Sequence, residues 1–224
     1  MENSPRQLKR KESALAIALV AVLVLGLALI ELPRSNQVSS SFALTSTASS
    51  ASPDSLALKL LLNATSISSG HAISIGIDEQ NTLPRTNNVS SAKSWRLNGL
   101  GTGPCGPLNA PLGIGIMKGY YADNNASAGA LLDLYQPGQY NCPMILSGIG
   151  AYVFQPSSDM ASVIGSCDPN PCLTLNMSST VSSKGYWSSN LLQGATFSNF
   201  SPGVYTVVAG DEWGTLVLLH FIVR

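Results

Sequence analysis

The residues that most often carry out catalysis are scarce in this chain of 224 residues. Its two histidines are His71, which follows a turn glycine, and His220, which lies in an apolar segment near the end. We expect His71 to face solvent and His220 to be a buried structural imidazole with one hydrogen-bond partner. The chain has no Gly-x-Ser-x-Gly nucleophile motif and no Cys-His-Met copper pattern. The sequence therefore predicts no catalytic residue and no cofactor.

Two acidic pairs, Asp78-Glu79 and Asp211-Glu212, could hold a cation if both members of a pair lay in a loop. Calcium takes about six to eight oxygen ligands, and the chain contains no Asp-x-Asp-x-Asp-Gly loop that would supply them. We interpret both pairs as solvent-exposed residues at strand ends and predict no metal site. Trp213, directly after the second pair, is expected to close one end of the core.

The cysteines number four, an even count that predicts two disulfides in an exported domain. Cys167 and Cys172 bracket the turn-forming tetrapeptide Asp-Pro-Asn-Pro, so we pair them with each other and pair Cys105 with Cys142. The alternative, a four-cysteine zinc site, would need a second closely spaced pair, which Cys105 and Cys142 do not form.

Five asparagines stand in Asn-x-Ser/Thr sequons and are candidates for glycosylation. Two of them, Asn88 and Asn125, fall in predicted loops and are better acceptors than the two at strand ends, Asn63 and Asn199. The fifth is Asn176. Unmodified asparagines that serve turns are the alternative interpretation.

The charge pattern indicates which elements would position these residues. Charged residues make up 11% of the chain, against about 25% in an ordinary domain, and the net charge is zero, so no basic surface for nucleic acid is expected. The uncharged run Ala14–Ile30 is preceded by a basic cluster that ends at Lys11 and is followed by Pro33. By the positive-inside rule, we expect residues 1–13 to be cytoplasmic, 14–32 to form a signal-anchor helix in the membrane lipid, and the rest to be extracytoplasmic. The alternative is a cleaved signal peptide, for which Ser41-Phe42-Ala43 is the best cleavage site.

The remainder divides into a linker and one domain. The segment 33–55 is rich in Ser and Thr and is expected to be a flexible tether. Residues 56–224 are enough for one domain with a sizeable core. A long irregular stretch, Gln80–Pro111, is unusual for a compact domain and suggests a functional insertion.

The domain is predicted to be all-β, an antiparallel sandwich, because short apolar segments alternate with polar residues between Gly, Pro and Asn turns. No segment after residue 34 has a convincing helical period, and Ser127–Leu134 could form at most two helical turns. The final strand is apolar on both faces, so we expect it to be covered on both sides. The predicted strands are Leu56–Leu62, Ile73–Asp78, Gly113–Met117, Gly150–Gln155, Leu173–Met177, Ala195–Phe200, Val204–Ala209 and Thr215–Val223.

The tract Pro202–Gly214, which reads PGVYTVVAGDEWG, and the apolar strand after it resemble the closing hairpin of Ig-like sandwich domains in membrane-anchored exported proteins, including uncharacterised archaeal ones. This resemblance implies an Ig-like sandwich on the outer face of a membrane and no catalytic residues. Proteinase inhibitors with an Ig-like fold also end in a Gly-x-Tyr hairpin. Archaeal pilins and archaellins similarly join one N-terminal apolar helix to a glycosylated β-sandwich, but Lys11 here is followed by Glu12 rather than by a small residue.

The sequence thus predicts a single-pass membrane glycoprotein whose outer Ig-like domain binds a protein or glycan at the cell surface or has a structural role there. A pilin-like filament or adhesion subunit is the main alternative. An extracellular hydrolase with a site in Gln80–Pro111, or a proteinase inhibitor, is a further alternative.

Overall fold

The computed structural model describes residues 45–224 except 104–105, 108–110, 139–147, 166–172 and 191–193. The described residues form mainly antiparallel strands, with two short 3₁₀ helices, η1 (Pro53–Ser55) and η2 (Asp123–Ala128). The all-β prediction is therefore confirmed. No helix among these residues is long and apolar enough to cross a bilayer, and the segment predicted to do so, 14–32, lies outside them.

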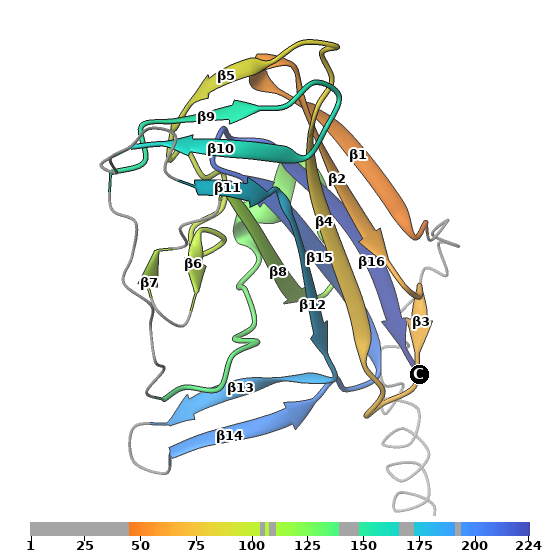
Figure 1. The fold of residues 1–224 in the computed structure, drawn as a ribbon. Coiled ribbons are helices and arrows are strands. Elements are labelled where there is room, and N and C mark those ends of the chain that lie inside the picture. Colours follow the sequence, from red (N-terminus) through yellow and green to blue (C-terminus); the bar gives the residue numbers. More distant parts are fainter. Residues whose placement is uncertain (1–44, 104–105, 108–110, 139–147, 166–172, 191–193) are drawn as a thin grey trace, which may run out of the picture. The chain divides into compact units, whose positions relative to one another are not determined.

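Three four-stranded sheets make up most of the structure (Figure 1). The first has the order β1-β2-β4-β12, from Thr47–Ser52, Leu56–Leu62, Ile73–Asn81 and Ser178–Ser183. The second has the order β3-β16-β15-β8, from Ser66–Ile67, Leu216–Val223, Gly203–Asp211 and Leu112–Lys118, and only β3 pairs in parallel. The third has the order β11-β10-β9-β5, from Leu173–Asn176, Met160–Ile164, Ala151–Phe154 and Asn87–Ser90.

Two hairpins accompany these sheets. Strands β6 (Thr102–Gly103) and β7 (Gly106–Pro107) form one, and β13 (Gly185–Asn190) and β14 (Gly194–Asn199) form the other. On the second hairpin Trp187 and Phe197 face each other across the strands, with ring centroids 5.1 Å apart. Such cross-strand aromatic pairs stabilise two-stranded sheets.

One core joins the inner faces of the three sheets. Alternate residues of β2 and β4 point inward, as the sequence pattern predicted, and they meet the inward residues of β15 and β16. Tyr152 and Phe154 of β9 bring the third sheet into the same core. Burial of these large apolar side chains is the main source of stability, at about 25 cal/mol per Å².

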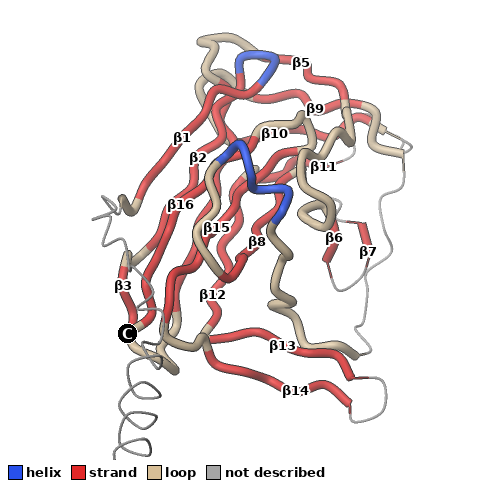
Figure 2. Tube along the Cα trace, turned by 180° about the vertical axis from the view of Figure 1, so that it is seen from behind, coloured by secondary structure: helices blue, strands red, loops and turns tan. Residues whose placement is uncertain are grey.

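A second, smaller core covers the other face of the second sheet. Leu97 and Leu100, from the stretch predicted as an irregular insertion, pack with Met117 of β8 and Val208 of β15. Ala126 of η2 packs there as well, and Figure 2 shows η2 crossing this face. The stretch is thus partly structural, because it covers the sheet. Strand β15 is buried on both faces, while the outer face of β16 beyond Leu216 is only half-buried.

Glycines in β8 explain how the covering loop fits. A Cβ atom on Gly113 would lie 2.1 Å from the carbonyl oxygen of Leu100, and one on Gly115 would lie 2.5 Å from Leu131. Both distances are far shorter than a van der Waals contact. The alternation of glycine with Ile114 and Ile116 therefore gives β8 one face for the main core and one face smooth enough to receive the loop.

All eight predicted strands are present, with ends shifted by a few residues at most. The tether prediction was wrong for its last part, because Thr47–Ser52 form β1 and pair with β2 along its whole length. The segment Ser127–Leu134 contains only the end of η2 and then runs extended. Within Gln80–Pro111 the structure has β5, β6 and β7.

Candidate binding cleft

A cleft of about 450 Å³ opens between the loop 98–102, the outer edge of β8 and the segment 131–138. Its volume falls in the range of small-ligand sites, about 300–1,000 Å³. The lining residues are Asn98, Gly99, Thr102, Ile114, Gly115, Leu131, Leu132, Asp133, Leu134, Tyr135, Gln136, Pro137 and Gly138.

The cleft exists because the segment 131–138 leaves the edge of β8 and turns to another strand. Leu131 forms an antiparallel bridge with Met117, and the amide of Leu132 donates to the carbonyl of Ile116 at 2.8 Å. Asp133, one residue later, bridges instead to Trp187 of β13, whose amide donates to the Asp133 carbonyl at 2.8 Å. The segment therefore forks away from β8 and leaves the edge open beside Ile114.

The open edge carries free main-chain groups. The residues flanking β8 bond to β15 and to the residue after it, since Gly119 donates to the carbonyl of Val204 and Pro111 accepts from Glu212. In an antiparallel pair such residues alternate with residues whose amide and carbonyl point away. Ile114 is one of the outward-pointing residues, and in the described part of the chain its amide and carbonyl have no partner.

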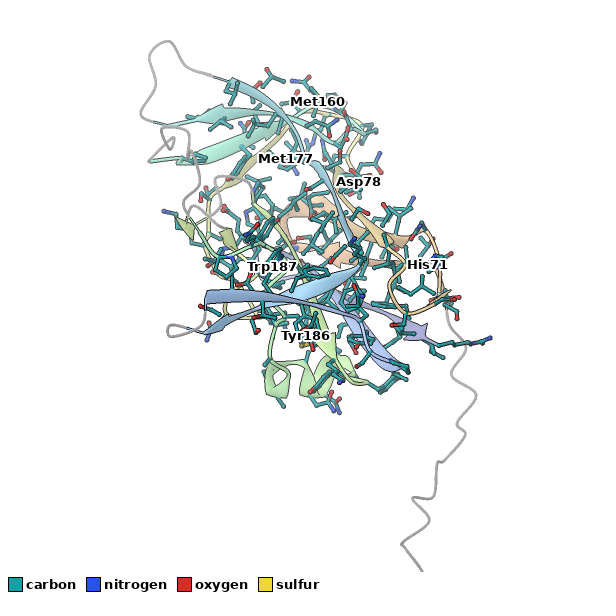
Figure 3. All side chains as sticks on the ribbon, turned by 90° about the horizontal axis from the view of Figure 1, so that it is seen from below. His71, Asp78, Met160, Met177, Tyr186 and Trp187 are labelled. Atoms are coloured by element: carbon teal, nitrogen blue, oxygen red, sulfur yellow. The ribbon has the colours of Figure 1, made fainter. Side chains whose placement is uncertain are left out.

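The side chains that line the cleft are aliphatic and polar, with one aromatic ring, Tyr135, and no basic residue among them. Asp133 is the charged residue in the lining, and it is exposed. One of its carboxylate oxygens accepts a hydrogen bond from the Tyr135 amide at 3.2 Å. Tyr135 is 44% exposed, and Trp187 of β13, labelled in Figure 3, is bridged to Asp133. The arrangement can bind a neutral or cationic ligand but offers no nucleophile paired with a base.

The sequence reasoning missed this cleft. A helix over Ser127–Leu134 would not diverge from β8 in this way, and Asp133 does not belong to any recognisable sequence motif. The one available signal was the polar and turn-forming run Tyr135-Gln-Pro-Gly138 after a short apolar segment.

The acidic pairs occupy quite different positions from those predicted. The interpretation as solvent-exposed turn residues was wrong for Glu79, Asp211 and Glu212, which are buried. Strand alternation does separate the first pair, since Glu79 points inward and Asp78 is only half-buried on the opposite face. The structure thus brings the Glu79 carboxyl of β4 within electrostatic reach of the Asp211 carboxylate of β15.

Asp211 is held by donors from three directions. Its Oδ1 accepts from the amides of Trp213 at 3.0 Å and Thr215 at 2.7 Å. Its Oδ2 accepts from the Ser52 hydroxyl at 2.5 Å, and the Thr215 hydroxyl donates to Ser52 in turn at 2.7 Å. The carboxylate therefore fastens the end of β1 to the turn between β15 and β16.

Glu79 has a different environment. Neither of its carboxyl oxygens accepts a hydrogen bond from a donor group of the described residues. Burial, the neighbouring carboxylate of Asp211 and the charge of Asp78 together raise the pKa of Glu79 to about 9. The pKa of Asp78 is also raised, first by burial and then by Asp159, while Lys59 opposes the shift.

Glu212 and Trp213 complete the closed end of the core. One oxygen of Glu212 accepts from the Ala92 amide at 3.1 Å, and Tyr152 hydrogen-bonds to the same carboxylate. Burial and this carboxylate raise the pKa of Tyr152. Trp213 is 7% exposed, contacts Tyr152 edge-on and donates its indole N–H to the carbonyl of Ser90 at 2.8 Å. The core-closing role predicted for Trp213 is confirmed.

The two histidines have separate surroundings. His71 is exposed, as predicted, and Figure 3 shows it at the periphery. His220 is half-buried rather than fully buried, and its Nε2 lies 2.9 Å from the carbonyl oxygen of Tyr121. Its ring stacks on Tyr120 at a centroid distance of 4.2 Å. His220 therefore has the hydrogen-bond partner expected from the sequence but not the expected burial.

The remaining predicted sites are partly outside the described residues. All four cysteines, Cys105, Cys142, Cys167 and Cys172, lie there, so their pairing stays a prediction. The five sequon asparagines are all described and all exposed. Asn88 lies in strand β5 and Asn125 in η2, so neither is in the loop that was predicted, whereas Asn63 and Asn199 stand at strand ends as expected. The side-chain oxygen of Asn176 accepts from Ser178 within its own sequon at 2.7 Å.

In the part of the chain that the structure describes, no three His, Cys, Asp or Glu side chains form a group that could hold a metal ion. Comparison of the chain with protein-family models, with curated proteins and with solved structures gave no match.

Proposed function

We propose that this protein is a single-pass, membrane-anchored recognition protein whose extracytoplasmic Ig-like β-sandwich binds an extended peptide in the cleft beside β8. The observation that carries the proposal is the open main-chain edge at Ile114, next to the exposed carboxylate of Asp133. The apolar run 14–32 after a basic N-terminus supports the membrane location.

A free strand edge inside a cleft suits a peptide better than other ligands. An extended peptide can add to β8 as a further strand, donating to and accepting from the outward carbonyl and amide of Ile114. Asp133 would pair with a Lys or Arg side chain of that peptide, and Tyr135 would pack on its aliphatic part. A glycan could use Tyr135 and the polar lining but would leave the main-chain edge without a complementary partner.

The binding test uses the full-length protein in detergent micelles and an array of extended peptides with and without one basic residue. We expect binding of the basic peptides, and at least tenfold weaker binding when the central peptide amides are N-methylated, because methylation removes the donors that pair with Ile114. Asp133→Asn should weaken binding by a similar factor, whereas Asp54→Asn, at an exposed turn, should not. An affinity that N-methylation does not change would contradict the peptide proposal, and so would binding to a glycan array instead of to the peptides.

The membrane anchor has its own test, N-terminal sequencing of the mature protein. A start near Met1 supports the anchor, while cleavage after Lys11 would favour the pilin-like filament subunit.

Mass spectrometry without reduction should show four hydrogens fewer than the reduced chain if both disulfides form. Activity of the protein on hydrolase substrates, or inhibition of a proteinase, would favour the lower alternatives.

A further inference from the structure

We propose that Glu79 and Asp211 form a carboxyl pair that binds one proton between the first and second sheets and so makes the domain more stable in acid than in alkali. Both residues are buried and neither lines the cleft, so this inference is independent of peptide binding.

The geometry decides which member holds the proton. Asp211 accepts three hydrogen bonds, from Ser52, Trp213 and Thr215, so both of its carboxylate oxygens already have donors. Glu79 is 0% exposed and receives no donor, so its ionised form would have neither water nor a hydrogen bond to stabilise it. A protonated Glu79 can instead donate to Asp211, which satisfies both groups.

Among the described residues, no positive charge acts on Glu79. The groups that act on Glu79 are the carboxylates of Asp211 and Asp78, and both favour its protonated form. Glu212, next to Asp211, is a further carboxylate, and it hydrogen-bonds to Tyr152 of β9. Lys59 of β2 and Asp159 act on Asp78, on the opposite face of β4. The neutral neighbours Ser52 and Thr215 bond to each other and to Asp211.

The shared proton has a structural role, because it joins elements of two sheets. Glu79 belongs to β4 of the first sheet, and Asp211 ends β15 of the second. Loss of the proton would leave two adjacent anions in the core and would push these strands apart. Between the ordinary pKa of 4.5, which applies to the unfolded chain, and the folded pKa of about 9, the folded state holds one proton more than the unfolded state. Rising pH therefore lowers the folding equilibrium constant, by up to about tenfold per pH unit in this window.

The test compares urea unfolding of the full-length protein and of Glu79→Gln between pH 5 and pH 9. The amide of the variant can still donate to Asp211 but cannot ionise. The free energy of unfolding of the variant should therefore decrease much less between pH 5 and pH 9 than that of the unmodified protein. Asp123→Asn, which removes an exposed carboxylate bound to Arg96, is the matched control. Its stability should decrease with pH as much as that of the unmodified protein. Equal pH dependence of the unmodified protein and the Glu79→Gln variant would overturn the proposal.

A second measurement does not depend on the variant being able to fold. The infrared spectrum of the unmodified protein at pH 7 should contain the carbonyl band of a protonated carboxyl group, which an ionised carboxylate does not give. Absence of this band from the folded protein at pH 7 would overturn the proposal.

Discussion

Two turns of this domain share one local hydrogen-bond motif, but one turn is buried and the other is exposed. In Asp211-Glu212-Trp213 and in Asp133-Leu134-Tyr135, the aspartate carboxylate accepts a hydrogen bond from the amide of the aromatic residue two positions later. The first aspartate is 0% exposed and its tryptophan 7% exposed, whereas the second aspartate is exposed and its tyrosine is 44% exposed. The same turn closes the core in one place and lines a cleft in the other.

The difference comes from residues far away in the sequence. Ser52 reaches Asp211 from 159 residues away, and Ser90 accepts the indole N–H of Trp213 from 123 residues away. The described residues supply no such distant donor to the Asp133 carboxylate. Local chemistry therefore sets the shape of the turn, and long-range partners decide whether it becomes part of the core.

The aromatic residues provide the largest contrast. Trp213→Ala should destabilise the domain by about 3–5 kcal/mol, because it removes a buried ring packed on Tyr152 and a buried hydrogen bond to Ser90. Tyr135→Ala should change stability by less than about 0.5 kcal/mol, because Tyr135 lies at the surface and is 44% exposed. Chemical denaturation of both variants gives the comparison. Similar losses for the two would show that the cleft segment is as much a part of the core as the closed turn.

The aspartates themselves should differ by somewhat less. Asp211→Ala leaves the Ser52 hydroxyl and two turn amides without their acceptor, which should cost about 3 kcal/mol. Asp133→Ala removes one bond at the surface and should cost about 0.5 kcal/mol or less. Thermal unfolding at pH 6 measures both, and a larger loss for Asp133→Ala than for Asp211→Ala would refute this assignment of roles.

Glycines near the two turns give the smallest of the three effects. Gly113 pairs with Gly210 just before the closed turn, and a methyl group there would collide with the backbone at Leu100. Gly113→Ala should therefore cost about 1–3 kcal/mol. Gly138, in the cleft segment, has no atom within 4 Å of an added Cβ, so Gly138→Ala should be nearly neutral. A neutral Gly113→Ala would mean that the loop 97–101 does not rest on β8 as described.

Sequence alone predicted the strands whose apolar residues alternate strictly, such as Leu56–Leu62 and Ile73–Asp78. It missed eight of the sixteen strands in the described residues, among them β1 and β12, which read TASSAS and SSTVSS. These strands hold their place by pairing with β2 and β4 rather than by burying large side chains, so their composition resembles that of a linker. A pattern of hydrophobicity cannot reveal a strand that is defined by its neighbour.

The burial of Glu79 could have been predicted from the sequence, but its pairing with Asp211 could not. Ile73, Ile75 and Ile77 occupy the inward positions of β4, and the same period assigns Glu79 to the buried face. Treating the strand as ended at Asp78 concealed this. The partner, Asp211, could not be found from the sequence, because 132 residues with no shared motif separate it from Glu79. The cleft was unpredictable for the same reason, since it depends on where the segment 131–138 leaves β8.

The long reach from Ser52 to Asp211 also fixes the order in which the domain can be completed. Strands β1, β2 and β4 are synthesised early, yet the strands that cover their apolar face, β15 and β16, lie more than a hundred residues later. A nascent chain cannot close this core until those last strands have left the ribosome. Non-local pairing of this kind makes folding slow and leaves aggregation-prone apolar strands exposed until folding is complete. Premature termination anywhere before β16 would therefore yield a chain that aggregates instead of a smaller folded protein.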